Sequence, residues 1–381
     1  MSDIISYLKR KKDYSFSEEP FNEVDALVLS QFIYLKLDDL VPFTSEKREN
    51  VMLYDVANRM DYEKVFGDKR YAKSNKLLLR AMVESRRYRG MQLNYFSSIT
   101  SIVAETQFAA ITCFLEGGPI IIVYRGTDET LVGWKEDFNM FFKEPVTGQN
   151  LSEIYLQSVS KLINQKFSLA GHSKGGNFAV YAAMKASDEV QDRIEKVYTF
   201  DNPGFRPEIL QSVDFNKVRS KISKFIPRSS FFGMFLESEE EYQVVECSSK
   251  GVKQHNPFQW QVEDNTFRKG KELDHGSLML KETFNEWLYG LEDDELRCFA
   301  EVWYQVLRKA NMVTVLDFMK DPAKNLVKLA EVIKETDEET KECAKEITLS
   351  LMEMAREHRE KKRSNFKLQI EKLIVKNKDF E

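Results

Sequence analysis

Three glycines surround one serine between two apolar segments, and this feature constrains the fold more than any other. Residues 167–170 predict a strand, residues 174–185 predict a helix, and Gly171-His-Ser-Lys-Gly-Gly176 lies directly between them. A turn of this kind projects the serine oxygen from the end of the strand, and nearby glycines remove side chains that would collide. We therefore interpret Ser173 as a nucleophile on a sharp turn. A glycine-rich turn without chemistry is the alternative.

The elements around this turn alternate, which predicts parallel strands joined by crossover helices. A hairpin is expected at Gly117-Gly118. Strands are predicted at residues 91–98, 107–115, 119–125, 167–170, 196–200, 221–226, 242–247 and 258–262, and helices at 17–37, 75–89, 152–164 and 174–185. The predicted fold class is therefore α/β, with a mostly parallel sheet flanked by helices.

The C-terminal part differs in composition from the rest of the chain. After Leu273 it holds one proline and two glycines among charged, helix-periodic residues. We predict an α/β domain over residues 1–290 and a helical C-terminal extension over 291–381. The stretch 355–381 holds nine Lys/Arg and five Asp/Glu, which predicts a solvated helix, with transient contact to a membrane surface or a protein as the alternative.

Charge and cysteine content narrow the expected partners and location. Lys+Arg 56 against Asp+Glu 61 gives a net charge of −5, so no nucleic-acid partner is expected. No signal peptide or membrane-spanning segment is recognised. The four cysteines match no zinc spacing, so we expect reduced thiols, no metal and a cytoplasmic protein; they are Cys113, Cys247, Cys298 and Cys343.

A serine hydroxyl needs a base, and histidine has a suitable pKa at neutral pH. The chain has four histidines. His172 adjoins the serine and should point into packing, while His358 belongs to the charged tail. His255, in a loop after strand 242–247, is the preferred base. His275, in a turn that begins a helix, is the alternative.

Asp201 is the preferred carboxylate for orienting that base. It directly follows the strand 196–200, so it should emerge at the same sheet edge as Ser173. Alternatively, Asp201 only starts the turn formed by Asn202-Pro-Gly204. The alternative carboxylates, of which the run 239–241 should be solvated, are Glu237, Glu239, Glu240, Glu241 and Glu246.

The turn Gly126-Thr127 follows strand 119–125 and is the second half of a predicted oxyanion hole. The backbone N–H groups of Thr127 and Lys174 would be its donors, whereas an ordinary Gly-Thr turn is the alternative. Arg125 and Asp137 are expected to pair and hold this loop. The aromatic residues that follow predict either a lid or acyl-binding wall or plain core packing; they are Trp134, Phe138, Phe141 and Phe142, with Met140 among them.

Taken together, these segments resemble the α/β-hydrolases, and specifically the class 3 lipases. The matching segments are Tyr124-Arg-Gly-Thr127, Trp134-Lys-Glu-Asp137, Ala170-Gly-His-Ser-Lys-Gly-Gly176, Val197-Tyr-Thr-Phe200 and Pro203-Gly204. Asp25-Ala-Leu27 and Gln254–Phe258 are also similar to an uncharacterised group of bacterial lipase-like proteins. The resemblance covers roughly residues 20–290 and implies an α/β-hydrolase fold there.

The sequence departs from the class 3 lipase pattern in one place. That family usually has its acid shortly before a proline after the next strand, and here this stretch is Lys224-Phe-Ile-Pro227, without a carboxylate. The assignment therefore moves to Asp201, at a position that some other α/β-hydrolases use. A Ser-His dyad is the alternative.

The residues and the resemblance predict a serine hydrolase that cleaves a carboxylic ester, of a small molecule or a lipid, through an acyl-serine intermediate. Ser173 would be the nucleophile, His255 the base and Asp201 the acid, without metal or organic cofactor. One alternative is a thioesterase or acyltransferase with the same triad. Another is a non-catalytic interaction protein with this fold.

Overall fold

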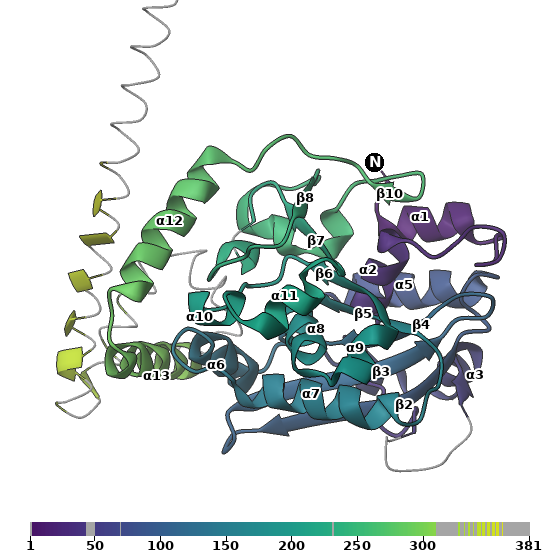
Figure 1. Cartoon of the computed structure of the whole chain (residues 1–381), viewed down its shortest axis with the longest axis horizontal. Coiled ribbons are helices and arrows are strands. Elements are labelled where there is room, and N and C mark those ends of the chain that lie inside the picture. The colour runs from purple at the N-terminus through teal and green to yellow at the C-terminus, as the bar shows by residue number, and fades with distance from the viewer. Residues whose placement is uncertain are drawn as a thin grey trace, which may run out of the picture. The chain divides into compact units, whose positions relative to one another are not determined.

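Eight strands form one sheet, and their order across the sheet is their order in the chain (Figure 1). The structure is a computed structural model that describes residues 2–42, 50–68, 70–230 and 232–309 and scattered positions between 327 and 360. The strands are β1 (Val51–Met52), β2 (Gln92–Ser101), β3 (Thr106–Phe114), β4 (Ile120–Tyr124), β5 (Phe167–His172), β6 (Ile194–Phe200), β7 (Ile222–Pro227) and β8 (Tyr242–Val245). β1 to β4 pair antiparallel, and β4 to β8 pair parallel.

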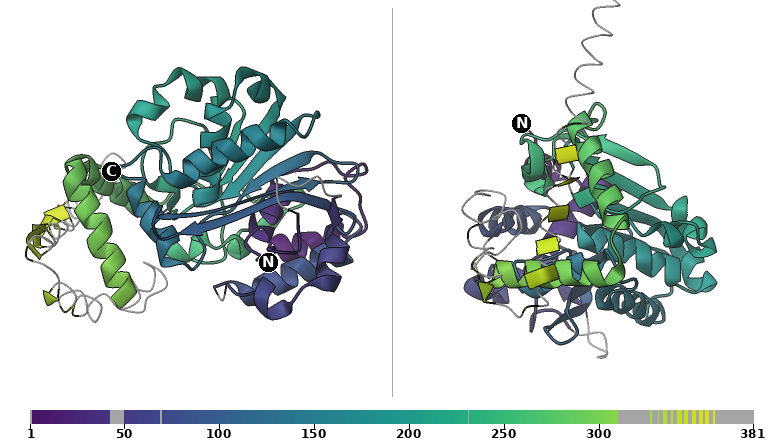
Figure 2. Two further views of the ribbon diagram at one scale, coloured as in Figure 1. Left: turned by 90° about the horizontal axis from the view of Figure 1, so that it is seen from below. Right: turned by 90° about the vertical axis from the view of Figure 1, so that its left-hand side faces the viewer.

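Helices cover both faces of this sheet. The α-helices of the first 273 residues are α1 (Ile4–Lys11), α2 (Glu23–Phe32), α3 (Leu53–Arg59), α4 (Tyr62–Val65), α5 (Ala72–Glu84), α6 (Leu131–Asn139), α7 (Thr147–Ser160), α8 (Lys174–Lys185), α9 (Asp188–Arg193), α10 (Pro207–Leu210) and α11 (Val213–Arg219). The left view of Figure 2 shows α1, α2 and α5 on one side of the sheet and α7 and α8 on the other. This is the predicted α/β-hydrolase fold, with a mostly parallel sheet flanked by helices.

Two hydrophobic cores result from the alternation of side chains along the buried strands. Ile121 and Val123 of β4 face the core that includes α1, α2 and α5. Ile122 and Tyr124 face the core that includes α7, α8 and α11. Both faces of β4 and β5 are covered, so β4 is apolar throughout and β5 is mostly apolar, which explains their clear signal in the sequence.

Some elements differ in the structure from those predicted from the sequence. The helix predicted over 17–37 is the shorter α2, which begins after a capping box formed by Asn22 and Asp25. The strand predicted at 258–262 is wrong. Pro257 begins a short 3₁₀-helix, η3 (Pro257–Gln259), whose N-cap Asn256 accepts the Phe258 N–H. Trp260 forms an isolated bridge to Cys247, and a strand begins only at β9 (Val262–Glu263), paired with β10 (Thr266–Phe267). Two other 3₁₀-helices are η1 (Phe232–Met234) and η2 (Gly251–His255).

The chain divides into two compact units, Met1–Leu273 and Asp274–Glu381. The second unit contains α12 (His275–Tyr289) and α13 (Asp293–Lys309), so the boundary predicted at residue 290 falls between these helices. Most of the basic stretch 355–381 lies outside the described residues. Over the described residues, no helix is both long and apolar enough to cross a membrane.

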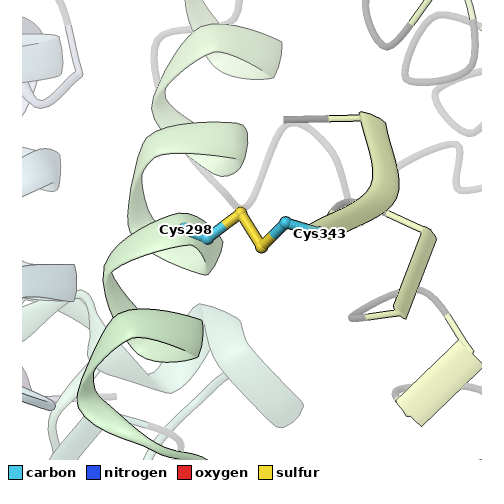
Figure 3. Close-up of a disulfide and its surroundings, with 2 residues drawn as sticks. All are labelled: Cys298 and Cys343. Atoms are coloured by element: carbon cyan, nitrogen blue, oxygen red, sulfur yellow. A yellow bond between two sulfur atoms is a disulfide. The ribbon is translucent and has the colours of Figure 1, made fainter. Parts of the chain in front are cut away.

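The second unit contains a disulfide between Cys298 of α13 and Cys343 (Figure 3). The expectation of four reduced thiols is therefore wrong for this pair, whereas Cys113 and Cys247 are free. The two bonded cysteines are 45 residues apart, and no local spacing pattern indicates such a contact. Disulfides are most common in oxidising compartments, and the cytoplasmic location stays a prediction.

Candidate active site

Ser173 lies on a strained turn between β5 and α8. Its backbone has φ 57° and ψ −135°, a conformation that a non-glycine residue adopts at a cost. A Cβ on Gly171 would overlap the backbone of Gly175, and one on Gly175 would overlap the carbonyl of Tyr124. The glycines therefore allow the strand and helix to approach closely around Ser173.

The carboxylate of Asp201 contacts the imidazole of His255. Asp201 follows β6 with φ 48°, is fully buried, and accepts a 2.6 Å hydrogen bond from His255 Nδ1 on Oδ2. Oδ1 accepts hydrogen bonds from the Ser230 hydroxyl and, at 3.1 Å, from the Gly233 N–H. The carboxylate therefore has partners on both oxygens, and its contact with Nδ1 leaves Nε2 as the free nitrogen of the His255 ring among the described residues.

The alternative carboxylates and the alternative base have other surroundings. Glu239 pairs with Arg219, and Glu240 is buried against Lys224 at 3.0 Å, so the expectation that residues 239–241 are all solvated is wrong. His275 is the first residue of α12, after the N-cap Asp274.

Two rings pack against His255. The Phe232 ring centroid lies 4.3 Å from that of His255, and the His172 centroid lies 4.6 Å from it. His172 Nε2 donates to the His255 carbonyl at 3.0 Å, and its Nδ1 lies 3.2 Å from the Tyr34 hydroxyl. Burial, and then the charge of His255, lower the pKa of His172 well below its ordinary value. His172 is thus buried and neutral, and it fixes the segment that carries His255.

The turn after β4 lies against the turn that carries Ser173. A Cβ on Gly126 would overlap the His172 carbonyl and lie 3.1 Å from Ser173 Cβ. Thr127 donates its hydroxyl to Asp137, at 2.8 and 2.7 Å from the two carboxylate oxygens, and its carbonyl accepts a 2.6 Å hydrogen bond from Arg70.

Two backbone donors remain free beside the serine. In the described part of the chain, the N–H groups of Thr127 and Lys174 donate no hydrogen bond to another protein group. Likewise, no hydrogen bond joins Ser173 Oγ to His255 among the described residues. Such bonds are often long without a substrate.

The side chain of Lys174 points into a buried charged network. Its ammonium lies 2.8 Å from Glu136 and 3.7 Å from Asp137. Although burial acts to lower it, the pKa of Lys174 is raised by these two carboxylates. Burial raises the pKa of Asp137 to about 6. The expected pair of Arg125 with Asp137 is wrong, because Arg125 lies 3.4 Å from Asp128 and Asp137 binds Thr127 instead.

Aromatic side chains from two segments meet beside His255. The Trp134 ring lies 6.1 Å from that of Phe232, and Phe141 lies 5.7 Å from Phe235. Phe232 also contacts His255, which links these aromatics to the candidate base. The segment after β4 therefore packs against the loop after β7, and this cluster lies next to the candidate site rather than in a remote core.

Sequence reasoning missed several residues that shape this site. Tyr34, Arg70, Ser230 and Gly233 belong to no recognisable motif, and they reach the site only because distant loops converge. Within the described residues, no cluster of His, Cys, Asp and Glu could hold a metal ion.

Comparison with known proteins gives a family and distant structural neighbours. The model of the Mbeg1-like family matches residues 82–305. No curated protein sequence matches the chain. The solved structure of M37 lipase is similar at 12% identity and a TM-score of 0.34, covering 56% of this chain and 70% of that one. The native propeptide complex of Rhizomucor miehei lipase is similar at 15% identity and a TM-score of 0.33. This match covers 66% of this chain and 91% of that one. At these scores, the fold class rests on the sheet order of the chain itself.

Proposed function

The chain belongs to the Mbeg1-like family, whose model matches more than half of it, and we propose that it is a serine hydrolase that cleaves a carboxylic ester. The observation that carries this proposal is the 2.6 Å contact of Asp201 with His255 beside a serine held at φ 57°. A protein that only bound a partner would have no need for this strained turn together with an oriented histidine.

In the proposed reaction, Ser173 Oγ attacks the ester carbonyl and gives its proton to His255 Nε2. The N–H groups of Thr127 and Lys174 stabilise the oxyanion, each by roughly 3 to 4 kcal/mol. The C–O bond then breaks, the leaving alkoxide takes the proton from His255, and acyl-Ser173 remains. Water, deprotonated by His255, hydrolyses this acyl group and returns the free serine. Asp201 stays ionised and stabilises the imidazolium.

A fluorophosphonate probe tests the nucleophile directly. We expect one adduct on Ser173, located by mass spectrometry, and no labelling of the Ser173→Ala variant. Adduct formation that persists in Ser173→Ala would reject the assignment. A complete lack of labelling of the wild type would favour a non-catalytic interaction protein.

Matched ester and thioester substrates of equal acyl length separate the proposed esterase from a thioesterase. Turnover of the ester should equal or exceed that of the thioester. Transfer of the acyl group to an added alcohol, in preference to water, would indicate an acyltransferase.

A further inference from the structure

Two side chains from the N-terminal part of the chain reach both halves of the proposed site. Tyr34 follows α2, and Arg70 precedes α5, so neither belongs to the turns that carry Ser173, His255 or Thr127. Tyr34 is 4% exposed, and the side chain of Arg70 is 19% exposed. Their polar atoms are directed at the protein interior next to the site.

The His255 carbonyl and the Tyr34 hydroxyl together favour one tautomer of His172. Burial raises the pKa of Tyr34 and lowers that of His172, so the first keeps its proton and the second stays neutral. Tyr34 then donates to Nδ1 of His172 at 3.2 Å, which leaves the imidazole proton on Nε2. In the opposite tautomer, the unprotonated Nε2 would face the His255 carbonyl, so two acceptors would meet there.

The proton on Nε2 of His172 holds the backbone of the proposed base. Nε2 donates to the His255 carbonyl at 3.0 Å, and the two rings are 4.6 Å apart with an interplanar angle of 36°. His172 is also the residue before Ser173. The nucleophile turn and the loop of the base are therefore joined through one side chain, and Tyr34 bonds the other nitrogen of that side chain.

Tyr34 and Arg70 also support the proposed oxyanion turn. A Cβ on Gly126 would overlap the Tyr34 hydroxyl, so this hydroxyl lies directly against the turn. Arg70 donates to the Thr127 carbonyl at 2.6 Å, and its guanidinium carbon lies 5.7 Å from the Tyr34 ring centroid. One cluster thus contacts both the turn with the oxyanion donor and the histidine that holds the base.

We propose that Tyr34 is a positioning residue that stabilises the Nε2-protonated tautomer of His172 and thereby aligns His255 with Ser173, while Arg70 holds Thr127 in the same cluster. This inference rests on the proposed hydrolase function. The N-terminal segments carry no group of the proposed reaction. In this proposal, they align the turn with the oxyanion donor and the loop with the base.

The test compares Tyr34→Phe with the wild type on a p-nitrophenyl ester. Loss of the hydroxyl should lower kcat about tenfold and leave KM within about twofold, because Tyr34 aligns the base without touching substrate. Tyr155→Phe is the matched control, since Tyr155 is also buried and its hydroxyl donates to the Tyr95 carbonyl at 2.7 Å. Its kcat should stay within about twofold of wild type.

A second pair of variants tests the N–H of His172. His172→Gln can keep an amide donor toward the His255 carbonyl, whereas His172→Leu cannot, so Gln should retain at least about fivefold more kcat than Leu. Equal kcat values for Tyr34→Phe and Tyr155→Phe would overturn the proposal. An increase in KM with unchanged kcat would also overturn it, because Tyr34 would then bind substrate.

Imidazole ¹⁵N NMR separates this inference from the function on which it rests. The wild type should show His172 protonated on Nε2 only, and Tyr34→Phe should show a mixture of tautomers. An unchanged tautomer in Tyr34→Phe rejects the role of Tyr34 whatever the protein catalyses. Turnover that survives in Ser173→Ala rejects the proposed function. The NMR result would still show whether the Tyr34 hydroxyl affects the His172 tautomer.

Discussion

Two aspartates of the α/β unit are completely buried, and their surroundings differ. Asp25 of α2 accepts hydrogen bonds from Arg87, Tyr7, Tyr88 and the Asn22 N–H. Asp201 accepts from His255, Ser230 and Gly233. Both carboxylates are fully satisfied, as burial of a charge requires.

The difference lies in the partner of each carboxylate and in the backbone. Arg87, the partner of Asp25, has a fully buried side chain, and Asp25 lies in a regular helix. His255, the partner of Asp201, is 12% exposed, and its Nε2 bonds no protein group in the described part of the chain. Asp201 itself has φ 48°. A closed cluster of this kind stabilises a fold, whereas an open one with a strained backbone is typical of a reaction site.

Asp201→Asn should give the largest effect and act on activity. An amide cannot hold Nδ1 of His255 protonated in the same way, so kcat on a p-nitrophenyl ester should fall about 10³- to 10⁴-fold. Urea unfolding of Asp201→Asn should show a much smaller loss of stability than that of Asp25→Asn.

Glu246→Gln is the matched control for Asp201→Asn. Glu246 is an alternative acid whose backbone groups bond to Arg268 and Gln261. Its kcat should stay within about twofold of wild type. Similar losses of kcat in both variants would reject Asp201 as the orienting carboxylate.

Asp25→Asn should act on stability instead. It leaves the buried Arg87 without a counter-charge, so the free energy of unfolding should fall by about 3 to 5 kcal/mol. Urea titration measures this change, and kcat per folded molecule should match the wild type. A large loss of kcat in fully folded Asp25→Asn would contradict the view that Asp25 stabilises the fold while Asp201 serves the reaction.

Gly126→Ala tests whether the close approach of the Gly126-Thr127 turn to His172 is needed for activity. The new Cβ would overlap the His172 carbonyl, so the Thr127 N–H should move and kcat should fall about 10²-fold. Gly276→Ala is the control, because its Cβ would meet only the flexible Asp274 carboxylate, at 3.1 Å. If kcat for Gly126→Ala matched that of Gly276→Ala, the Thr127 donor would have no role.

The smallest effect concerns the pH dependence of stability. Burial lowers the pKa of His172 well below 6.5. As pH falls through about 6.5, the unfolded chain binds a proton there and the folded chain does not, so acid destabilises the fold. In the closed cluster, burial raises the pKa values of Tyr7 and Tyr88, so these groups do not titrate near neutral pH.

The comparison of wild type with His172→Gln isolates this contribution. Between about pH 7.5 and 5.5, the free energy of unfolding of the wild type should fall more steeply than that of the variant, by up to about 1.4 kcal/mol per pH unit. Parallel pH profiles in urea unfolding would mean that His172 is protonated in the folded state.

Much of the fold could be predicted because its signals are local. The apolar segments of β4 and β5 are covered on both faces, and the glycine cluster lies in one continuous strand-turn-helix segment of the chain. The strand predicted at 258–262 failed because Asn256 and Pro257 favour a 3₁₀ turn that overrides the aromatic residues after them.

The sequence by itself determined the parallel strands around Ser173, the sharp turn that carries this serine and the choice of Asp201 and His255 as candidates, since these follow from spacing along neighbouring elements. Only the tertiary structure decided which side chains meet across distant loops. It paired Asp137 with Thr127 rather than Arg125, joined Cys298 to Cys343, and brought Tyr34 and Arg70 to the site. The physical reason is that such contacts depend on how crossover segments pack, and no local pattern of residues records that packing.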